Sequence, residues 1–342
     1  MNSKAPTSNL LLATGTEPSI LGEDYDLLNG PLPVPTTPEG LIAIAAVVEK
    51  INTGEYVFQE HHCPCGARGR DVVLARVDRY RIPHRTVLCK ACGLSRTSPR
   101  LVASAYTDFY ANYYRTIYER PNDTPERVID RQRANARRRY ELITCHIPRR
   151  PETILEIGCG AGWNLLPFYD AGCSVTGYDY DSDYLAAGRS RNLKLHQGGI
   201  DEALTDGKTH DLVILSHVLE HFLEPAQEVQ RVRSLLNPEG CLFIEVPSIL
   251  KTGHPLLRYF QSAHTYSFCR QTLTDCLSKT GLKPIFMDDM ITSLWCRARE
   301  GESSQAHGSP DLADSIVAQL KAIRPPSPLR RIGRRLRAWL SL

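Results

Sequence analysis

Short apolar runs recur along the second half of the chain, separated by turns and by segments of helical character. Runs of this kind are typical of strands that are buried on both faces of a parallel sheet. The pattern predicts strands at 153–157, 174–178, 193–197, 210–215 and 241–246. Strands that alternate with helices, such as those expected at 163–171 and before Leu236, indicate a doubly wound α/β sheet.

The first half of the chain is organised differently. A stretch rich in Ser, Thr, Pro and Gly precedes a helix start, in which Thr37 is the N-cap and Pro38 occupies the first turn. The segment 72–87 alternates as a β-hairpin does. The patterns predict a flexible N-terminus (1–36), a helix (37–54), a hairpin module (55–100), a helical connector (101–148), the α/β domain (149–298), and a linker with a basic amphipathic helix (299–342).

The composition is that of an ordinary globular protein, since 42% of the 342 residues are hydrophobic and 23% are charged. No apolar run approaches the roughly 20 residues that span a bilayer. Among the 11 cysteines, Cys159, Cys173 and Cys241 lie in apolar strands or turns, as free buried thiols do. We therefore expect a reducing, cytoplasmic setting.

Positive charge is unevenly distributed, although the net charge of +3 is too small to indicate nucleic-acid binding by itself. An arginine cluster at 127–139 is either a solvated helix face or a site for an anionic acceptor. The segment 329–342 is basic and amphipathic. It is either a helix docked on its own domain or a weak contact with an anionic surface of the inner membrane.

A glycine turn follows the first predicted strand of the α/β domain. Gly158, Gly160 and Gly162 would let a ligand approach the backbone closely. Asp179 ends the next strand, where a carboxylate can bind both ribose hydroxyls of a nucleotide. The sequence therefore predicts a nucleotide-type ligand at this corner of the sheet.

Two residues distinguish a dinucleotide from S-adenosylmethionine. The dinucleotide fingerprint needs a third glycine at the position where this chain has Trp163. Glu156, two residues before the turn, would repel a pyrophosphate but attract the amino group and the sulfonium of S-adenosylmethionine. S-adenosylmethionine is therefore the expected ligand.

Several longer motifs then match a known family. They are LEIGCGAG (155–162), VTGYD (175–179), HDLVILSHVLEH (210–221), LLNPEG (235–240) and FIEVPS (243–248). With them the chain resembles the class I S-adenosylmethionine-dependent methyltransferases. The resemblance implies a Rossmann-like seven-stranded sheet, parallel except for one antiparallel edge strand. The residues expected to contact the cofactor are Glu156, Gly158, Cys159, Gly160, Gly162, Asp179, Tyr180, Ile200 and Ser216.

Two cysteine pairs flank the hairpin of the first half, and a glycine follows each pair. The pairs are Cys63 with Cys65 and Cys89 with Cys92. Four thiolates at this spacing suit tetrahedral zinc, and four protein ligands leave no open position for catalysis. We therefore predict a structural zinc ribbon. Because the first pair is C-x-C rather than C-x-x-C, His61 or His62 is an alternative ligand to Cys63.

The ribbon narrows the resemblance to a bacterial group of methyltransferases that carry an N-terminal zinc ribbon. In that group a histidine and an aromatic residue precede a helix near the C-terminus, as His264 and Tyr266 precede the helix expected at 273–279 here. The group is often linked to surface-glycan or secondary-metabolite biosynthesis. The resemblance therefore implies a small-molecule acceptor, in particular a sugar or a nucleotide-linked sugar.

Catalysis by such an enzyme depends mostly on positioning, because the sulfonium is already activated. A hydroxyl acceptor would also need a general base. The candidate catalytic residues are His217, His221, His264 and Glu245. His217 and His264 are the favoured bases, since histidine titrates near neutral pH. Two alternatives stay open: an RNA methyltransferase whose ribbon and arginine cluster hold RNA, and a non-catalytic zinc-ribbon scaffold.

Overall fold

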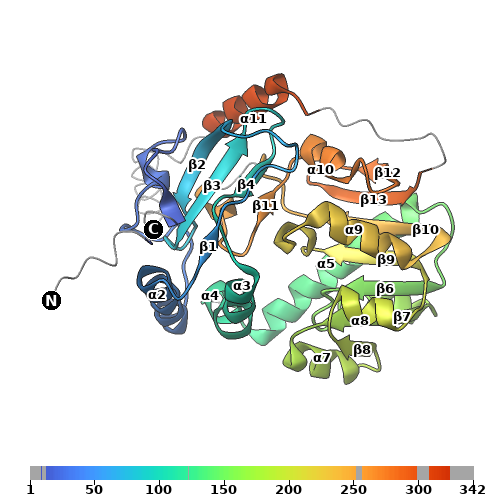
Figure 1. Ribbon diagram of the computed structural model, residues 1–342. Helices are drawn as coiled ribbons and strands as arrows, with labels where there is room; N and C mark the ends of the chain where they lie inside the picture. The colour runs from blue at the N-terminus through green and yellow to red at the C-terminus, as the bar shows by residue number, and fades with distance from the viewer. Residues whose placement is uncertain (1–8, 10–12, 122, 252–255, 299–307, 324–342) are drawn as a thin grey trace, which may run out of the picture. The chain divides into compact units, whose positions relative to one another are not determined.

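The chain folds into two compact units (Figure 1). The computed structural model describes residues 9, 13–121, 123–251, 256–298 and 308–323. The first unit combines the chain up to Pro121 with Ile249–His264 and the segment from Gly308 onward. The second unit combines Asn122–Ser248 with Thr265–His307.

The first unit begins with the helix that the sequence predicts. Helix α2 (Pro38–Thr53) starts at Thr37, whose hydroxyl accepts a hydrogen bond from the Gly40 N–H at 3.0 Å. It ends at Gly54, whose φ of 81° favours glycine. The other helical elements of this unit are η1 (Glu23–Tyr25), α3 (Ala103–Phe109), the π-helical turn η2 (Tyr110–Tyr114), α4 (Arg115–Tyr118), η4 (Leu256–Tyr259) and α11 (Pro310–Ala322).

The predicted hairpin is present in the same unit. Strands β2 (Asp71–Val77) and β3 (Pro83–Cys89) pair antiparallel, and β4 (Ser95–Thr97) pairs with the other side of β3. Strands β1 (Phe58–Gln59) and β5 (Arg100–Leu101) form a separate antiparallel pair. The two cysteine pairs therefore lie before β2 and at the end of β3.

The segment predicted as one helical connector contains helices that belong to different units. After α4 the chain becomes extended at Glu119, and helix α5 (Pro125–His146) starts afresh in the second unit. The Thr124 hydroxyl caps α5 by accepting a hydrogen bond from the Arg127 N–H. The arginine cluster thus lies on a helix of the α/β unit.

The second unit contains a seven-stranded sheet in the order β12-β13-β10-β9-β6-β7-β8. The strands are β6 (Thr153–Ile157), β7 (Ser174–Asp179), β8 (Lys194–Gln197), β9 (His210–Ser216), β10 (Leu236–Glu245), β12 (Leu282–Met287) and β13 (Thr292–Arg297). Strands β6 to β9 match the predicted strands to within one residue, whereas β10 begins at Leu236, five residues before its predicted start. These five strands run parallel. The mostly parallel α/β sheet is therefore confirmed.

The antiparallel strand does not lie at the edge, where the family resemblance places it. Strand β13 pairs antiparallel with both β10 and β12, so it is one place in from the edge. A short connection between β12 and β13 makes them antiparallel neighbours, because a parallel pair would need a long crossover. Figure 1 shows β12 outside β13.

The helices of this unit are shorter than the sequence predicts. Helix α6 (Leu166–Asp170) starts three residues after Trp163, because the glycine turn continues as further turns. The helix expected after β9 is the turn η3 (Leu219–His221) followed by α9 (Pro225–Ser234). The remaining elements are α7 (Ser182–Arg189), α8 (Ile200–Thr205), β11 (Tyr266–Ser267) and α10 (Arg270–Leu277). Ile143 of α5 and Phe168 of α6 pack into the sheet's hydrophobic core.

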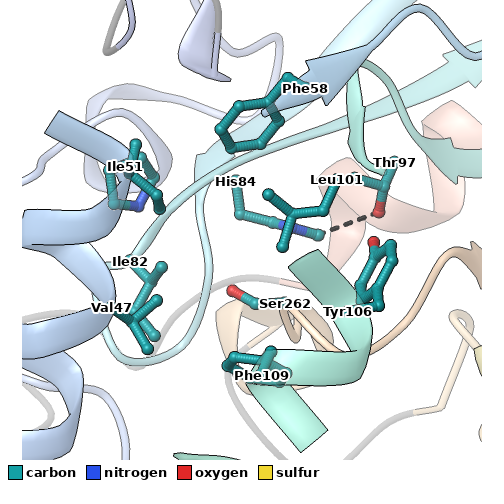
Figure 2. A pocket seen from close by; sticks show the side chains of 11 residues that line it. Val47, Ile51, Phe58, Ile82, His84, Thr97, Leu101, Tyr106, Phe109 and Ser262 are labelled. Carbon is teal, nitrogen blue, oxygen red and sulfur yellow. Dashed lines mark hydrogen bonds between the residues drawn. The ribbon is translucent and has the colours of Figure 1, made fainter. Parts of the chain in front are cut away.

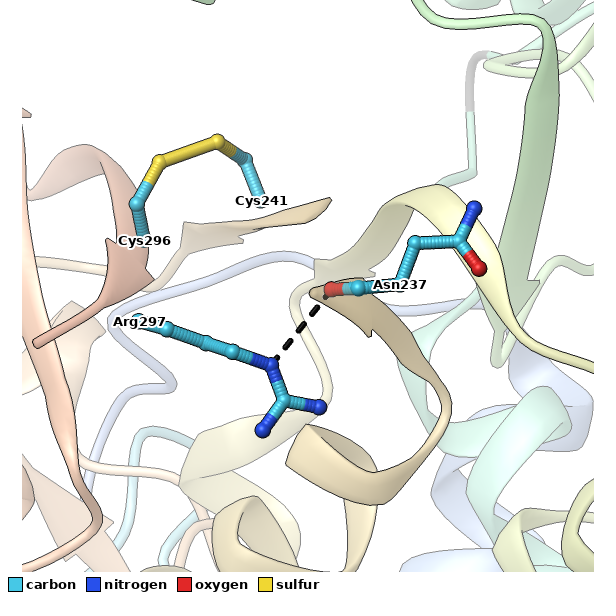
Figure 3. The surroundings of a disulfide bond; sticks show 4 residues. All are labelled: Asn237, Cys241, Cys296 and Arg297. Carbon is cyan, nitrogen blue, oxygen red and sulfur yellow. Dashed lines mark hydrogen bonds between the residues drawn. A yellow bond between two sulfur atoms is a disulfide. The ribbon is translucent and has the colours of Figure 1, made fainter. Parts of the chain in front are cut away.

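A disulfide joins two strands of the sheet and corrects one expectation. Cys241 of β10 and Cys296 of β13 are bonded, and they are direct cross-strand partners (Figure 3). The sequence predicts Cys241 as a free thiol, because nothing local in it shows that β13 becomes the neighbour of β10. Cys159 and Cys173 are free, as predicted. The cytoplasmic setting stays a prediction.

Some predicted features lie outside the described residues, among them most of the segment 1–12 and the basic amphipathic helix at 329–342. Among the helices that the structure does describe, none combines the length and the apolar character that crossing a membrane requires.

Candidate functional site

The glycine turn after β6 has a backbone that only glycine adopts readily. Gly158, Gly160 and Gly162 have φ angles of 70°, 51° and 72°. A Cβ atom on Gly158 would lie 2.5 Å from a methyl group of Val218, and one on Gly162 would lie 2.7 Å from Leu193. Around Gly160, by contrast, the nearest atom to a Cβ would be 3.9 Å away. The outer glycines are thus needed for packing, and the middle one borders open space.

Asp179 is held against this turn. One of its carboxylate oxygens accepts a hydrogen bond from the Gly160 N–H at 2.7 Å, and the other accepts one from the Asp181 N–H at 2.8 Å. The carboxylate therefore has a fixed position beside the glycines at the carboxyl end of β7, where open α/β sheets bind ligands.

Glu156 is a deeply buried acid of the site, with 1% of its surface exposed. The Asn164 side-chain amide donates a hydrogen bond to its Oε1 at 2.6 Å, whereas its buried Oε2 has no partner in the described protein. Burial raises the pKa of Glu156 to about 8. A buried carboxylate oxygen without a partner favours a cationic ligand group at this position.

A hydrogen-bonded network of polar side chains connects Glu156 with the end of β10. Arg139 of α5 is buried, and its guanidinium donates to Asn164 Oδ1 at 3.0 Å and to Glu245 Oε1 at 2.7 Å. Arg138 donates to the other oxygen of Glu245 at 2.6 Å from a half-exposed position. Burial alone would raise the pKa of Glu245, but His217 and these arginines hold it well below its usual range.

His217 lies at the far end of this network of polar side chains, directly after β9. It has a left-handed φ of 58°, and its N–H donates to the Glu245 backbone carbonyl at 2.8 Å. Its ring nitrogens lie 3.3 Å from Glu245 Oε1 and 3.5 Å from Glu220 Oε1. The His217 side chain is 48% exposed. Partial loss of water would lower its pKa, but the two carboxylates outweigh this effect and raise the pKa to about 9. His217 is therefore an imidazolium at neutral pH.

The other predicted cofactor residues occupy varied positions in the second unit. Ser216 ends β9, and Ile200 is buried at the start of α8. Cys159 is buried against Gly177, where a Cβ atom would lie 2.7 Å from its sulfur. Tyr180 follows Asp179 and is 72% exposed, so its ring is free to cover a ligand.

The remaining predicted catalytic histidines differ in surroundings. His221 lies in η3, where its Nε2 is 4.0 Å from Glu220 Oε1. His264 belongs to the first unit and is buried there. Its backbone carbonyl accepts a hydrogen bond from the Thr97 hydroxyl at 2.8 Å. The second unit therefore contains His217, His221 and Glu245, but not His264.

Sequence reasoning missed Arg139, Asn164 and Glu220. The sequence treats Arg139 only as a member of the arginine cluster, either a solvated face or an anionic-acceptor site, yet Ala136, Arg139 and Ile143 are the buried residues of α5. Their spacing of three and four residues marks one face of a helix. An arginine on the face that carries the apolar residues is the signal that could have indicated a buried partner.

The four predicted metal ligands come together in the first unit. The Cys63 and Cys92 sulfurs are 3.5 Å apart, and the Cys65 and Cys89 sulfurs are 3.7 Å apart. All four sulfurs lie within 4.8 Å of one another. Tetrahedral zinc with bonds of about 2.3 Å places its sulfurs about 3.8 Å apart. The geometry fits a four-thiolate zinc site.

The histidine alternatives to Cys63 are not supported by the geometry. The His61 ring is engaged elsewhere: Nδ1 is 2.9 Å from the Thr97 carbonyl and Nε2 is 3.1 Å from the Arg100 guanidinium. Burial and the Arg100 charge lower the pKa of His61 to about 4, so it is neutral. His62 is exposed.

The first unit also contains a small cavity between α2, the hairpin and α3 (Figure 2). Its lining is mostly apolar, with Val47 and Phe109 on two sides, and its polar contact joins His84 Nε2 to the Thr97 hydroxyl at 3.2 Å. Burial lowers the pKa of His84 to about 4. The centre of a water molecule can explore about 10 Å³ in it, which suits a single water and not a cofactor.

Comparison with known proteins identifies the family. A family described as a methyltransferase domain matches residues 114–285, which is half of the chain. This chain belongs to that methyltransferase family. The match covers the glycine turn, Asp179, His217 and Glu245, and also α5 with Arg138 and Arg139.

Relatives of this methyltransferase chain match it in part. A probable S-adenosylmethionine-dependent methyltransferase of Mycolicibacterium smegmatis is 26% identical over 150 residues, which are 43% of this chain and 58% of the relative. A ubiquinone biosynthesis O-methyltransferase of Hydrogenovibrio crunogenus is 30% identical over 112 residues, 31% of this chain and 46% of the relative. The chain thus spans about half the length of these relatives.

Among solved structures, a 1,6-didemethyltoxoflavin-N1-methyltransferase of Burkholderia thailandensis with bound S-adenosylhomocysteine is similar. The match covers 60% of this chain and 96% of that chain, with 17% identity and a TM-score of 0.44.

Proposed function

We propose that this protein transfers a methyl group from S-adenosylmethionine to a small acceptor, specifically a sugar or a nucleotide-linked sugar. The observation that carries the proposal is the buried, unpartnered Oε2 of Glu156 beside a glycine turn that has space at Gly160 and a fixed carboxylate at Asp179. Membership of the methyltransferase family supports the same activity.

The residues of the α/β unit would divide the work of holding the cofactor. Glu156 would attract the cationic amino-acid end, and Asp179 would accept hydrogen bonds from the ribose hydroxyls, as the spacing of both acids along the sheet edge allows. The glycine turn would let the backbone N–H groups approach the ligand. When bound, the sulfonium supplies an activated methyl group, so the chain's own task is alignment of the acceptor.

The positive charge on His217 argues against this residue as the general base of methyl transfer. A histidine whose pKa is raised to about 9 is already protonated at pH 7 and would not accept a proton from the acceptor there. We infer that His217 instead donates a hydrogen bond or stabilises negative charge that develops on the acceptor oxygen. His264 stays the proposed base for a hydroxyl acceptor.

A small acceptor fits the arginine cluster better than RNA does. Of the arginines on α5, Arg131 pairs with Asp123 and Arg137 pairs with Glu141. Arg138 and Arg139 both pair with Glu245. Because each of these guanidiniums is already engaged by a carboxylate, with Glu245 shared by two of them, they are less available to a phosphate backbone. A relative named for O-methylation in ubiquinone biosynthesis is a further support for a small acceptor.

We also propose that the four cysteines hold a structural zinc. Their sulfur separations match a tetrahedral thiolate set, and four protein ligands leave no position for a substrate. The zinc would stabilise the ribbon and take no part in methyl transfer.

Calorimetric titration tests the proposed cofactor. S-adenosylmethionine or S-adenosylhomocysteine should bind the purified protein, and Asp179→Ala should weaken binding at least tenfold, or about 1.4 kcal/mol. Asp183→Ala, which removes an exposed acid of α7, is the matched control. Binding of NAD without binding of S-adenosylmethionine would overturn the proposal. Methyl transfer to a panel of free and nucleotide-linked sugars, followed by mass spectrometry, then tests the acceptor class.

A further inference from the structure

Two arginines of the α/β unit share one tryptophan. Trp163 directly follows the glycine turn, and the Arg191 guanidinium carbon lies 4.0 Å from its ring centroid. The Arg133 guanidinium, from α5, lies 5.8 Å from the same centroid. Cation–π attraction thus gathers two positive charges from distant parts of the sequence beside the cofactor turn.

Neither of these two charges has a carboxylate partner among the described residues. Arg133 makes no hydrogen bond or ion pair with the described residues, in contrast to its paired neighbours on α5. Arg191 donates from its Nη2 to the Ala161 carbonyl at 2.7 Å, which anchors it to the glycine turn. Its Nε is buried and has no hydrogen-bond partner in the described part of the chain. An N–H buried without a partner is unfavourable unless a ligand satisfies it.

The charges also repel each other. Burial and the nearby Arg133 charge both lower the pKa of Arg191. A group with two or more negative charges would relieve the repulsion and form charge-assisted hydrogen bonds with both guanidiniums. A single carboxylate would provide less charge, and an uncharged sugar would provide none.

We propose that Arg133, Trp163 and Arg191 form a binding site for the diphosphate of a nucleotide-linked sugar acceptor. The proposal rests on the methyltransferase function proposed above and narrows its acceptor from sugars in general to sugars that carry a diphosphate. The indole that both arginines contact adds an apolar surface to the site, and the hydrogen bond of Arg191 to Ala161 places the site next to the cofactor turn.

The test uses the full-length protein and inorganic pyrophosphate as the probe. Calorimetric titration should show pyrophosphate binding, and tryptophan fluorescence should change with it. With Trp339 replaced by Phe in every protein compared, Trp163→Phe should remove the fluorescence change, because the remaining Trp295 is fully buried. Arg133→Gln combined with Arg191→Gln should raise the Kd for pyrophosphate at least tenfold. Arg137→Gln, which alters an exposed arginine of the same helix, should leave it unchanged.

Arg133→Gln alone keeps the test decisive if the double variant folds poorly, because Arg133 is exposed and its loss breaks no hydrogen bond. It should weaken pyrophosphate binding several-fold while the Kd for S-adenosylmethionine stays within twofold. The proposed site would be wrong if pyrophosphate did not bind wild type. It would also be wrong if the single and the double arginine variants bound pyrophosphate as tightly as wild type.

The possible results distinguish a failure of the diphosphate site from a failure of the methyltransferase proposal. Pyrophosphate binding without any S-adenosylmethionine binding would support the anion site and refute the methyltransferase proposal. Methyl transfer to a free sugar, unaffected by Arg133→Gln, would support the function and refute the site. A single-stranded RNA that displaces pyrophosphate, with an affinity that falls steeply with salt, would show that the anion is a nucleic-acid backbone and would refute the diphosphate acceptor.

Discussion

Glu156 illustrates how burial changes the chemistry of one residue. The strand that carries it is buried on both faces, so the carboxyl loses water and gains only one hydrogen bond, from Asn164. Its raised pKa means that the ionised form is unfavourable until a cation arrives. We therefore expect binding of a cationic ligand at the proposed cofactor site to be coupled to loss of the Glu156 proton.

Binding of S-adenosylmethionine should depend on pH through Glu156. With a pKa of about 8 the unliganded residue is mostly protonated at pH 7, and a cationic ligand favours its ionised form. Binding should therefore release a proton at pH 7, and affinity should rise with pH up to about 8, by at most tenfold per pH unit. Calorimetry at pH 7 in buffers of different ionisation enthalpy measures the released proton directly.

The Glu156→Gln variant supplies the reference for that experiment. It retains the titration of the cofactor's own amino group but lacks the carboxyl, so the difference between the two pH profiles belongs to Glu156. An identical pH dependence in wild type and variant would contradict the assignment of the cationic end to this residue.

His217 gives a second pH dependence with a definite sign. Its pKa is raised from 6.5 to about 9, so the folded state binds the proton more tightly than the unfolded state does. The stabilisation is fully present below pH 6.5 and is lost as pH rises through 9. Urea unfolding of wild type and His217→Gln should show a difference that shrinks between these pH values. A constant difference would mean that the two carboxylates do not hold the proton.

At the scale of the element, α5 combines a core-packing helix with a charged anchor. Arg138 and Arg139 are adjacent in sequence and bind the same carboxylate, but Arg139 is buried and Arg138 is half exposed. Adjacent helix positions point about 100° apart, so only one of them can lie on the buried face. This difference allows a matched comparison.

Arg139→Gln should destabilise the α/β unit by about 3 kcal/mol, because it leaves Glu245 buried without its main partner. Arg138→Gln should cost less than about 1 kcal/mol, since solvent screens a half-exposed pair. With Trp339 replaced by Phe in every protein compared, denaturant unfolding followed by the fluorescence of Trp163 and Trp295, both in this unit, measures both values. Equal losses for the two variants would show that burial does not distinguish these arginines.

The elements differ in how far the sequence alone predicts them. Strands β6 to β10 and the glycine turn follow from local patterns, because burial on both faces and positive φ leave marks in a few consecutive residues. The Cys241–Cys296 disulfide, the place of β13 and the Arg139–Glu245 pair each join segments far apart in the chain. Their partners are fixed by sheet order and helix packing, which no short segment encodes.

Helix α11 packs against the turn at the second cysteine pair, Cys89 and Cys92. The glycines that follow the two cysteine pairs, Gly66 and Gly93, show this packing. A Cβ atom on Gly93 would lie 2.9 Å from Ile316 of α11, whereas one on Gly66 would meet nothing within 4 Å. Both have positive φ, of 79° and 85°. Lys90 also pairs with Asp314 of α11. The contact ties the segment after Gly308 to the ribbon.

Replacing these glycines separates backbone strain from packing. Gly66→Ala should cost about 1 kcal/mol from its left-handed backbone alone. Gly93→Ala should cost that amount plus the displacement of α11, and amide hydrogen exchange in 310–322 should accelerate. Thermal unfolding of both variants with zinc bound gives the comparison, and equal exchange in α11 would contradict the proposed contact.

At the scale of the whole molecule, the chain has two compact units with different sources of stability. The α/β unit has a large apolar core around its seven-stranded sheet. The ribbon of the first unit has only short strands around four cysteine sulfurs, and so small a module needs a metal to compensate for its limited burial. The two units should therefore respond differently to the loss of zinc.

Zinc removal should unfold the ribbon and leave the α/β unit folded. About one zinc per chain should co-purify, and Cys89→Ser with Cys92→Ser should abolish it, because thiolate ligation supplies an apparent 10–16 kcal/mol or so in small zinc modules. In the double variant, limited proteolysis should cut within 55–100, while S-adenosylmethionine still binds at the α/β unit with a Kd within threefold of wild type. Cys145→Ser, at an exposed free cysteine of α5, is the control and should retain the metal and resist the protease. Protein without stoichiometric metal, or a double variant that resists cleavage in the ribbon, would refute the structural zinc, since the four sulfurs would then be held together by packing alone.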